Sequence, residues 1–218
     1  MSHRLGERLA LDRVTVSFAE QRVGVIGANG SGKSTFARLL NGLIVPDSGR
    51  VTVDGLSTAR EGRQVRRNVG FVFTDPDAQI VMPTVAEDVA FGLRRSGLPR
   101  TEIVRRVSEV LSRFGLAGFD DRPAHLLSGG EKQLLALCSV LVTEPATVVC
   151  DEPTTLLDLR NSRRIAAVLA ELPQRVVLVT HDVPTLADFD RVLVFDDGRL
   201  VADDLPAPAV AAYRDLMG

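Results

Sequence analysis

The sequence predicts an α/β fold built on a parallel β-sheet with helices on both faces. Apolar runs of strand length recur along the whole chain of 218 residues, and continuous apolar runs are typical of strands that are buried on both sides. Stretches with helical periodicity separate several of these runs, as strand–helix–strand units require. A hydrophobic content of 45% and a charged content of 25% are ordinary for one globular domain.

The first unit reads as a strand, a tight loop and a helix. Arg22–Ile26 is a short apolar run that ends in glycines, and Phe36–Asn41 continues from them with helical spacing. Further strands are expected at Val51–Val53, Val69–Phe73, Val148–Cys150, Val176–Val179 and Val192–Phe195.

A helical block, from Asp75 to about Leu127, interrupts this alternation. Thr101–Phe114 places its apolar residues on one face and its arginines on the other, and Glu131–Val142 is a second, nearly apolar helix. We therefore expect a single domain, 1–218, in which 1–74 and 146–218 form the core and 75–145 form a mainly helical subdomain.

Charge and hydrophobicity limit the classes of partner. A formal net charge of -2 gives no electrostatic reason to expect nucleic acid. The longest apolar stretches, such as Leu134–Leu137, are far shorter than the ~20 residues of a membrane-spanning helix. The segment Met1–Arg8 also lacks the apolar core of a secretory signal. We expect a cytoplasmic protein that does not cross a membrane by itself.

A phosphate-binding loop of the form G-x-x-x-x-G-K-[ST] follows the first strand. Its residues are Gly27, Ala28, Asn29, Gly30, Ser31, Gly32, Lys33 and Ser34, with Thr35 next. Backbone N–H groups of the turn and the positive end of the following helix would converge on one spot, which favours phosphate. Lys33 supplies a charge for the outer phosphates, and the Ser34 hydroxyl is a candidate Mg²⁺ ligand.

Two carboxylates end a later strand. Val148–Cys150 leads into Asp151, Glu152 and Pro153, and ligands of open α/β sheets gather outside the carboxyl ends of strands. Because adjacent strand residues point to opposite sides, Asp151 can enter a Mg²⁺ shell while Glu152 faces a water as general base. The alternative for an isolated Asp-Glu-Pro is a polar turn, and the phosphate loop favours the catalytic interpretation.

A second Gly-rich segment, Leu127–Glu131, precedes the apolar helix. Ser128, Gly129 and Gly130 would expose backbone N–H groups at a helix N-terminus, which is a second place for an anion. Taken alone, Ser-Gly-Gly is more often a flexible connection.

In this order, the phosphate loop, Leu127–Glu131, Val148–Glu152, Thr154–Asp158 and Thr180–Asp182 resemble the ATP-binding cassette (ABC) ATPases over nearly the whole chain. The resemblance implies a P-loop NTPase core, a helical signature subdomain, an antiparallel β subdomain that is truncated here, and Mg-ATP as ligand. It implies a head-to-tail dimer in which Ser128, Gly129 and Gly130 cap the γ-phosphate of ATP on the other chain's Lys33.

The same resemblance assigns three further roles by position. Glu152 matches the catalytic glutamate, Asp158 the aspartate that communicates across the dimer, and His181 the histidine that contacts the γ-phosphate. For His181 alone, a polar strand end would be the simpler explanation.

Two positions depart from the family pattern. Thr74 stands directly after Val72-Phe73, where a glutamine that contacts Mg²⁺ or water is usual, and its hydroxyl has a shorter reach. Gln79, five residues on, matches a different position. Leu5 stands where an aromatic residue usually stacks on adenine.

The stretch Val69–Ile80, with Pro83–Val85 and Glu87–Gly92, resembles the energy-coupling-factor (ECF) importers of biotin, cobalt and nickel. This resemblance implies two ATPase subunits, here expected to be a homodimer, a membrane coupling protein and a substrate-binding membrane protein, with the ATPase on the cytoplasmic face of the membrane. Biotin is the first expectation for cargo, then cobalt or nickel. The residues Val81, Met82, Pro83 and Val85 are candidates either for the wall that receives the coupling protein or for internal packing.

Two other functions stay open. A soluble ABC ATPase of DNA repair or chromosome organisation would carry a long coiled coil or a second cassette, and neither pattern occurs here. A scaffold that holds ATP without turnover would lack the base, whereas Glu152 and His181 are both present.

Overall fold

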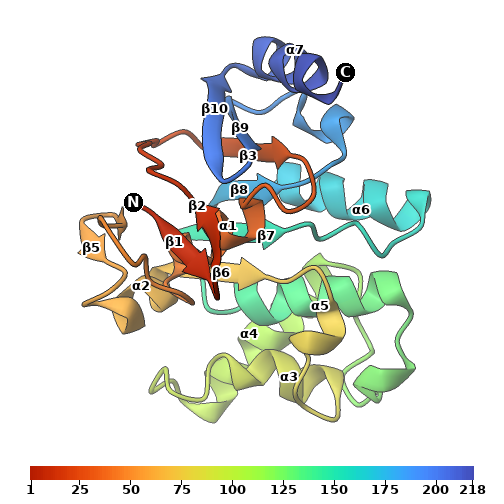
Figure 1. Ribbon diagram of the computed structural model, residues 1–218. Coiled ribbons are helices and arrows are strands. Elements are labelled where there is room, and N and C mark those ends of the chain that lie inside the picture. The colour runs from red at the N-terminus through yellow and green to blue at the C-terminus, as the bar shows by residue number, and fades with distance from the viewer. The chain divides into compact units, whose positions relative to one another are not determined.

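The computed structural model describes residues 1–218, which divide into two compact units (Figure 1). The first unit comprises Met1–Val69, Ala146–Glu152 and Pro173–Gly218, and the second comprises Gly70–Pro145 and Pro153–Leu172. All helices fall short of the length and hydrophobicity that a membrane-spanning helix requires.

The first unit contains a mostly parallel sheet with the strand order β10-β9-β3-β8-β7. Strands β3, β7, β8 and β9 run parallel to one another, and β10 is antiparallel to β9. These strands are β3 (Arg22–Gly27), β7 (Thr147–Asp151), β8 (Arg175–Val179), β9 (Arg191–Asp196) and β10 (Arg199–Asp204). Their parallel direction brings the carboxyl ends of β3, β8 and β7 to one edge.

Helices α1 (Lys33–Asn41) and α7 (Pro206–Met217) pack on this sheet. Helix α1 contacts β3, β7 and β8 through Phe36 and Leu39, which are fully buried, and α7 lies along β9 and β10 (Figure 1). A third helix, α2 (Gly62–Asn68), and the 3-10 turn η3 (Val183–Leu186) belong to the same unit. The packing of α1 on the sheet thus positions the loop between β3 and α1 at the carboxyl end of β3.

Two short antiparallel ribbons complete the first unit: β1 (His3–Leu5) with β2 (Arg8–Leu11), and β4 (Thr52–Val53) with β5 (Leu56–Ser57). The expected strand Val51–Val53 therefore pairs locally rather than within the parallel sheet. The reason is a turn at Asp54-Gly55, where both residues have positive φ (49° and 81°), as a tight hairpin requires.

The second unit, which begins within β6 (Val69–Val72), is mainly helical. Its elements are η1 (Pro76–Ala78), α3 (Val85–Phe91), α4 (Arg100–Arg113), η2 (Ala124–Leu126), α5 (Gly129–Leu141) and α6 (Leu159–Ala170). Helix α5 contacts α3, α4 and α6 and is the centre of this unit, which explains its nearly continuous apolar sequence.

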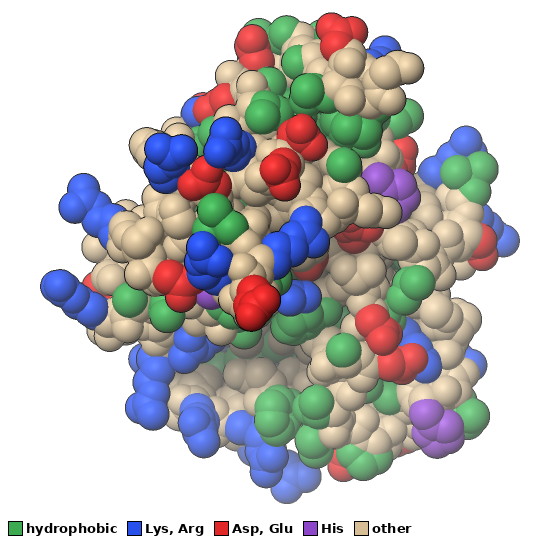
Figure 2. Space-filling view, in the orientation of Figure 1, with side chains coloured by type: hydrophobic (Ala, Val, Ile, Leu, Met, Phe, Trp, Pro, Cys, Tyr) green, Lys and Arg blue, Asp and Glu red, His purple; other side chains and the backbone are tan.

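The charge distribution agrees with a small net charge. On the face drawn in Figure 2, acidic and basic side chains both occur among polar and apolar groups. On α4 the arginines are paired, since Arg105 contacts Glu102 and Glu109, and Arg106 contacts Glu102 and Glu144. The basic face of α4 is thus accounted for by ion pairs with glutamates of the same chain.

Candidate functional site

The loop between β3 and α1 has the backbone conformation of a phosphate-binding loop. Gly27, Gly30 and Gly32 have φ of 150°, 77° and 102°, values that side chains with a Cβ rarely adopt. A Cβ on Gly27 would lie 2.0 Å from the Phe195 carbonyl oxygen, and one on Gly32 would lie 2.5 Å from that of Ala10. Gly27 and Gly32 are therefore required by close backbone packing as well as by conformation, and Gly30 by conformation.

The Lys33 side chain lies inside this loop. Its side chain is buried, and Nζ donates hydrogen bonds to the carbonyl oxygens of Gly27 (2.9 Å) and Ala28 (2.8 Å). Burial lowers the pKa of the ammonium group, while the nearby carboxylates of Glu152 and Asp151 act in the opposite direction. The Lys33 charge is thus held in the loop by two backbone carbonyl groups of the loop.

Ser34 and Asp151 meet across the first turn of α1 and the end of β7. The Ser34 hydroxyl donates to Asp151 Oδ1 at 2.8 Å, and Arg38 Nη2 lies 3.9 Å from Oδ2. Asp151 is 2% exposed, and this burial raises the pKa of its carboxyl, against the Ser34 hydrogen bond and the Arg38 charge, which lower it. A hydroxyl and a carboxylate oxygen at this spacing suit a hard cation such as Mg²⁺, which completes its shell with phosphate and water oxygens.

Glu152 and His181 form a second pair at the same edge. Glu152 Oε2 lies 3.3 Å from His181 Nδ1, after β7 and β8 respectively. The Glu152 backbone has φ of 51° while its N–H donates to Val179 O, so the chain turns here and sends Glu152 away from Asp151. The two carboxylates therefore have different surroundings: Asp151 is buried beside Ser34, and Glu152 faces His181.

A cavity of about 200 Å³ lies over this edge. The phosphate loop, Lys33 and Glu152 line it from the sheet side, and Leu5 and Arg8 line it from the β1–β2 ribbon. Leu5 is 53% exposed, and Arg8 Nη2 donates to the Gly30 carbonyl oxygen at 2.6 Å. The family resemblance predicts Leu5 near the nucleotide, whereas no local pattern predicts Arg8, which lies beside Leu5 only through the β1–β2 pairing.

The remaining predicted residues lie in the second unit. Ser128 caps α5, where its hydroxyl and Glu131 Oε2 are 2.7 Å apart and its backbone N–H donates to the same oxygen. Asp158 caps α6 through Asn161, whose side chain packs so closely on Gly130 that a Cβ there would lie 2.4 Å from Asn161 Oδ1. Gly130 and Asp158 are therefore brought together around Asn161, while Ser128 and Gly129 are exposed.

Gln79 does not stand in for the glutamine that the sequence lacks at Thr74. Its Oε1 accepts from Phe73 N and its Nε2 donates to Ala136 O, both at 3.1 Å. The amide thus ties the segment after β6 to α5. The metal role of Thr74, which follows Phe73 and is half-buried, stays a prediction.

Comparison with known proteins places this site in a family. A family model described as ABC transporter matches residues 11–155. The biotin transport ATP-binding protein BioM of Rhizobium etli is 51% identical over 211 residues, 97% of this chain and 94% of that protein.

Two solved structures agree with this match. The structure of cbiO1 from Clostridium perfringens, part of the ABC transporter complex cbiONQ, has a TM-score of 0.82 and 34% identity, covering 96% of this chain and 86% of that chain. The ATP-binding cassette MJ0796, a dimer in a post-hydrolysis state bound to ADP and Pi, has a TM-score of 0.81 and 28% identity, covering 94% and 95%. The chain therefore belongs to the ABC transporter family, as one of its ATP-binding, ATP-hydrolysing proteins.

Proposed function

We propose that this ATPase powers an importer of the energy-coupling-factor type, as a head-to-tail homodimer with two ATP sites. The observation that carries the proposal is the convergence of Lys33, the Ser34–Asp151 pair and the Glu152–His181 pair on one sheet edge. The similarity to BioM and cbiO1 supports the importer assignment.

Each side chain has a part in hydrolysis. The loop N–H groups and Lys33 hold the β- and γ-phosphates, and Ser34 with Asp151 would hold Mg²⁺, which neutralises charge on the phosphate oxygens. Glu152 takes a proton from the water whose oxygen bonds to the γ-phosphorus as the bond to ADP breaks. His181, beside Glu152, contacts the γ-phosphate.

The second subunit completes each site. Ser128 and Gly129 are exposed at the N-terminus of α5, where backbone N–H groups attract phosphate oxygens, so they are free to meet ATP bound to the other subunit's Lys33. ATP then contacts both subunits only in the closed dimer, and its hydrolysis removes the contact that favours closure. Asp158, held near Gly130 by Asn161, would transmit this change.

The membrane partners are a coupling protein and a substrate-binding protein, with the ATPase on the cytoplasmic face. Val81, 61% exposed in the segment before α3, is the best placed of the expected docking residues. Val85 is fully buried, which makes it part of the packing of α3 rather than of a docking wall.

The test is Glu152→Gln beside wild type and beside Glu171→Gln, which changes a carboxylate at the end of α6 outside the site. We expect Glu152→Gln to lower ATP turnover by about 10²–10⁴-fold, the usual contribution of a general base, and to form an ATP-dependent dimer in size-exclusion chromatography. Glu171→Gln should match wild type. Wild-type protein without ATPase activity, even with its membrane partners, would favour the non-hydrolysing scaffold.

Biotin is the proposed cargo, with cobalt or nickel as the alternative, and it rests on the similarity to BioM. Uptake of labelled biotin by cells that express the ATPase with its co-purifying membrane proteins should depend on Glu152. Uptake of labelled cobalt or nickel under the same conditions, without uptake of biotin, would show that the metal is the cargo. The assignment as an ATPase would not change.

A further inference from the structure

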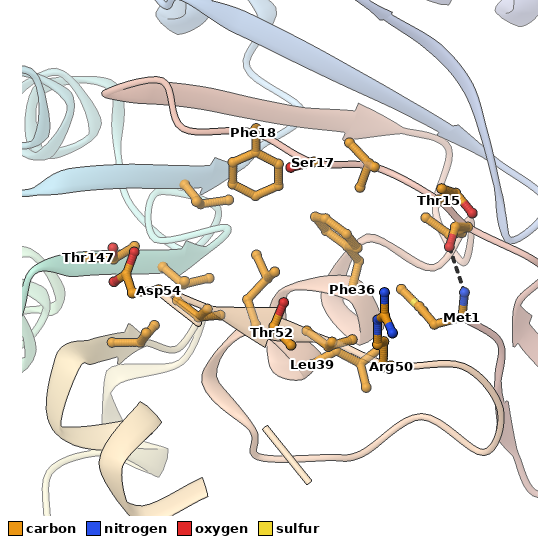
Figure 3. Close-up of a pocket in the computed structure, with 18 of the residues that line it drawn as sticks. Met1, Thr15, Ser17, Phe18, Phe36, Leu39, Arg50, Thr52, Asp54 and Thr147 are labelled. Atoms are coloured by element: carbon orange, nitrogen blue, oxygen red, sulfur yellow. Dashed lines mark hydrogen bonds between the residues drawn. The ribbon is translucent and has the colours of Figure 1, made fainter. Parts of the chain in front are cut away.

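A cavity of about 510 Å³ in the first unit shares no lining residue with the nucleotide site (Figure 3). Its floor is apolar and includes Phe36 and Leu39. Its charged side chains lie at opposite ends, with Asp54 beside Thr147 at one end and Arg50 at the other (Figure 3). A specific ligand site instead gathers its polar groups around one point. In the second unit, such a gathering occurs at the N-terminus of α5.

Glu131 lies in the first turn of α5, three residues after Ser128. Its Oε2 accepts hydrogen bonds from the hydroxyl and the backbone N–H of Ser128, both at 2.7 Å. In return, the Glu131 N–H donates to Ser128 Oγ at 3.4 Å, so each residue caps the other. The hydrogen bonds from Ser128 lower the pKa of the Glu131 carboxyl, which is therefore negatively charged at neutral pH.

This carboxylate lies at the place where the proposed dimer brings the γ-phosphate of the other subunit. The N-terminus of a helix favours one negative charge, and Glu131 already supplies one. A phosphate that meets Ser128 and Gly129 adds a second negative charge beside it, and like charges that meet in an interface oppose binding. The start of α5 therefore needs a cation that balances Glu131.

Arg122 supplies that cation. Its Nη1 lies 3.7 Å from Glu131 Oε1, the oxygen that Ser128 does not use. Its guanidinium carbon lies 4.6 Å from the centre of the Phe119 ring, a cation–π contact that fixes the side chain. The Arg122 and Glu131 side chains are 40% and 25% exposed, so the pair lies at the surface, where a phosphate can reach it.

The backbone of Arg122 is held in place as well. Its N–H donates to Phe119 O at 2.8 Å, and its carbonyl oxygen accepts from Val85 N at 3.2 Å. Two residues later, Ala124 N donates to Pro83 O at 2.8 Å. Arg122 is thus tied to the start of α3 and to the end of the proposed docking segment.

We propose that Arg122 is a positioning residue for the ATP of the other subunit. It balances the charge of Glu131 and keeps this carboxylate on Ser128, so that the start of α5 attracts the γ-phosphate instead of repelling it. Its backbone hydrogen bonds also link this phosphate contact to the segment where the membrane partner is proposed to dock. The role rests on the proposed head-to-tail dimer.

The test is a double-mutant cycle in the Glu152→Gln protein, in which ATP is hydrolysed slowly. Arg122→Gln should raise the Kd of the ATP-dependent dimer about 100-fold, roughly tenfold for each of the two sites, because Glu131 then meets phosphate without a cation. Glu131→Gln alone should give a dimer that is as tight or tighter, since an amide oxygen still accepts from Ser128. Sedimentation equilibrium at saturating Mg-ATP measures the Kd.

The combination of Arg122→Gln with Glu131→Gln separates a role in charge from a role in packing. We expect the combined protein to have a Kd within about threefold of that of Glu131→Gln, the usual error of such cycles. Arg113→Gln is the matched control, because Arg113 also lies over an aromatic ring, that of Phe114 at 5.2 Å, but has no ion pair. This control should leave the Kd unchanged.

Three results would contradict the expected ones. An equal rise in Kd with and without Glu131→Gln would show that Arg122 only packs on Phe119, and would overturn the proposal. A Kd that Arg122→Gln leaves unchanged would overturn it too. A Glu152→Gln protein that stays monomeric with ATP would overturn the head-to-tail dimer itself, so failure of the proposed function is distinguished from failure of the Arg122 role.

Discussion

Leu5 shows how one side chain can set the affinity for the nucleotide. It lines the cavity above Lys33 and the phosphate loop, so it is placed where the base of a bound nucleotide would lie. An aliphatic side chain offers apolar contact there, but no aromatic face for stacking. We therefore expect the phosphate loop to supply most of the binding free energy.

Leu5→Tyr should lower the Kd for ATP by about tenfold, since stacking of a base on an aromatic side chain contributes ~1–3 kcal/mol. The Kd is measured by titration of a fluorescent ATP analogue in the Glu152→Gln background, where hydrolysis does not interfere. Leu9→Tyr, on the same ribbon but outside the cavity, is the control and should leave the Kd unchanged. An unchanged Kd for Leu5→Tyr would place the base elsewhere.

At the scale of elements, Asp88 holds the segment before α3 in place. Its side chain is 3% exposed, and Oδ1 accepts from the N–H groups of Val81 and Met82 while Oδ2 accepts from the Ser139 hydroxyl on α5. One carboxylate thus links α3, α5 and the proposed docking segment.

Asp88→Ala should lower the free energy of unfolding by about 3 kcal/mol, because it leaves three partly buried donors without an acceptor. Asp88→Asn keeps one acceptor oxygen for Val81 and Met82, so its loss should be less than half as large. Urea denaturation followed by circular dichroism measures both. Equal losses for the two variants would mean that the charge, rather than the hydrogen bonds, stabilises this unit.

Elements with continuous apolar sequence were predictable, and elements defined by pairing were not. Strand β3 and helix α5 were expected within a few residues of their observed bounds, because burial on all sides imposes an apolar sequence. Strand β10 has polar residues on its exposed face, and α7 begins at Pro206, which is compatible with a first helical turn but reads as a helix breaker. The apolar run of β10 is only Leu200–Ala202, and that of α7 consists mainly of alanine and proline, so neither has the pattern of a buried strand or an amphipathic helix.

At the scale of the whole molecule, nucleotide binding should stabilise the folded protein. ATP at a hundred times its Kd adds ~2.7 kcal/mol to the free energy of unfolding if it binds only the native state, which corresponds to roughly 5–10 °C in Tm. Differential scanning fluorimetry measures the shift.

The chain offers a matched control for that shift. It contains two lysines, Lys33 in the phosphate loop and Lys132 on α5, which pairs with Asp77. Lys33→Ala should abolish most of the ATP-dependent rise in Tm, and Lys132→Ala should preserve it. A shift retained in Lys33→Ala would show that ATP stabilises the chain from another place.

Those parts of the candidate site that consist of consecutive residues could be predicted from the sequence. The phosphate loop and the Asp151-Glu152 pair each identify themselves by local pattern. Arg38 beside Asp151, and Arg8 beside Gly30, are joined to the site only by tertiary structure, and arginine on a helix or ribbon surface carries no local signal. Asn161, which links Gly130 to Asp158, was missed for the same reason.

The two hydrogen bonds of Lys33 make entry of a nucleotide an exchange reaction. A phosphate that binds here must interact with the ammonium group at least as strongly as the Gly27 and Ala28 carbonyl oxygens do. Only the difference between the two sets of contacts counts toward affinity. A single small anion gains little by that exchange, whereas a triphosphate that also engages the loop N–H groups gains on several atoms at once. We therefore expect the loop to bind a triphosphate more tightly than inorganic phosphate.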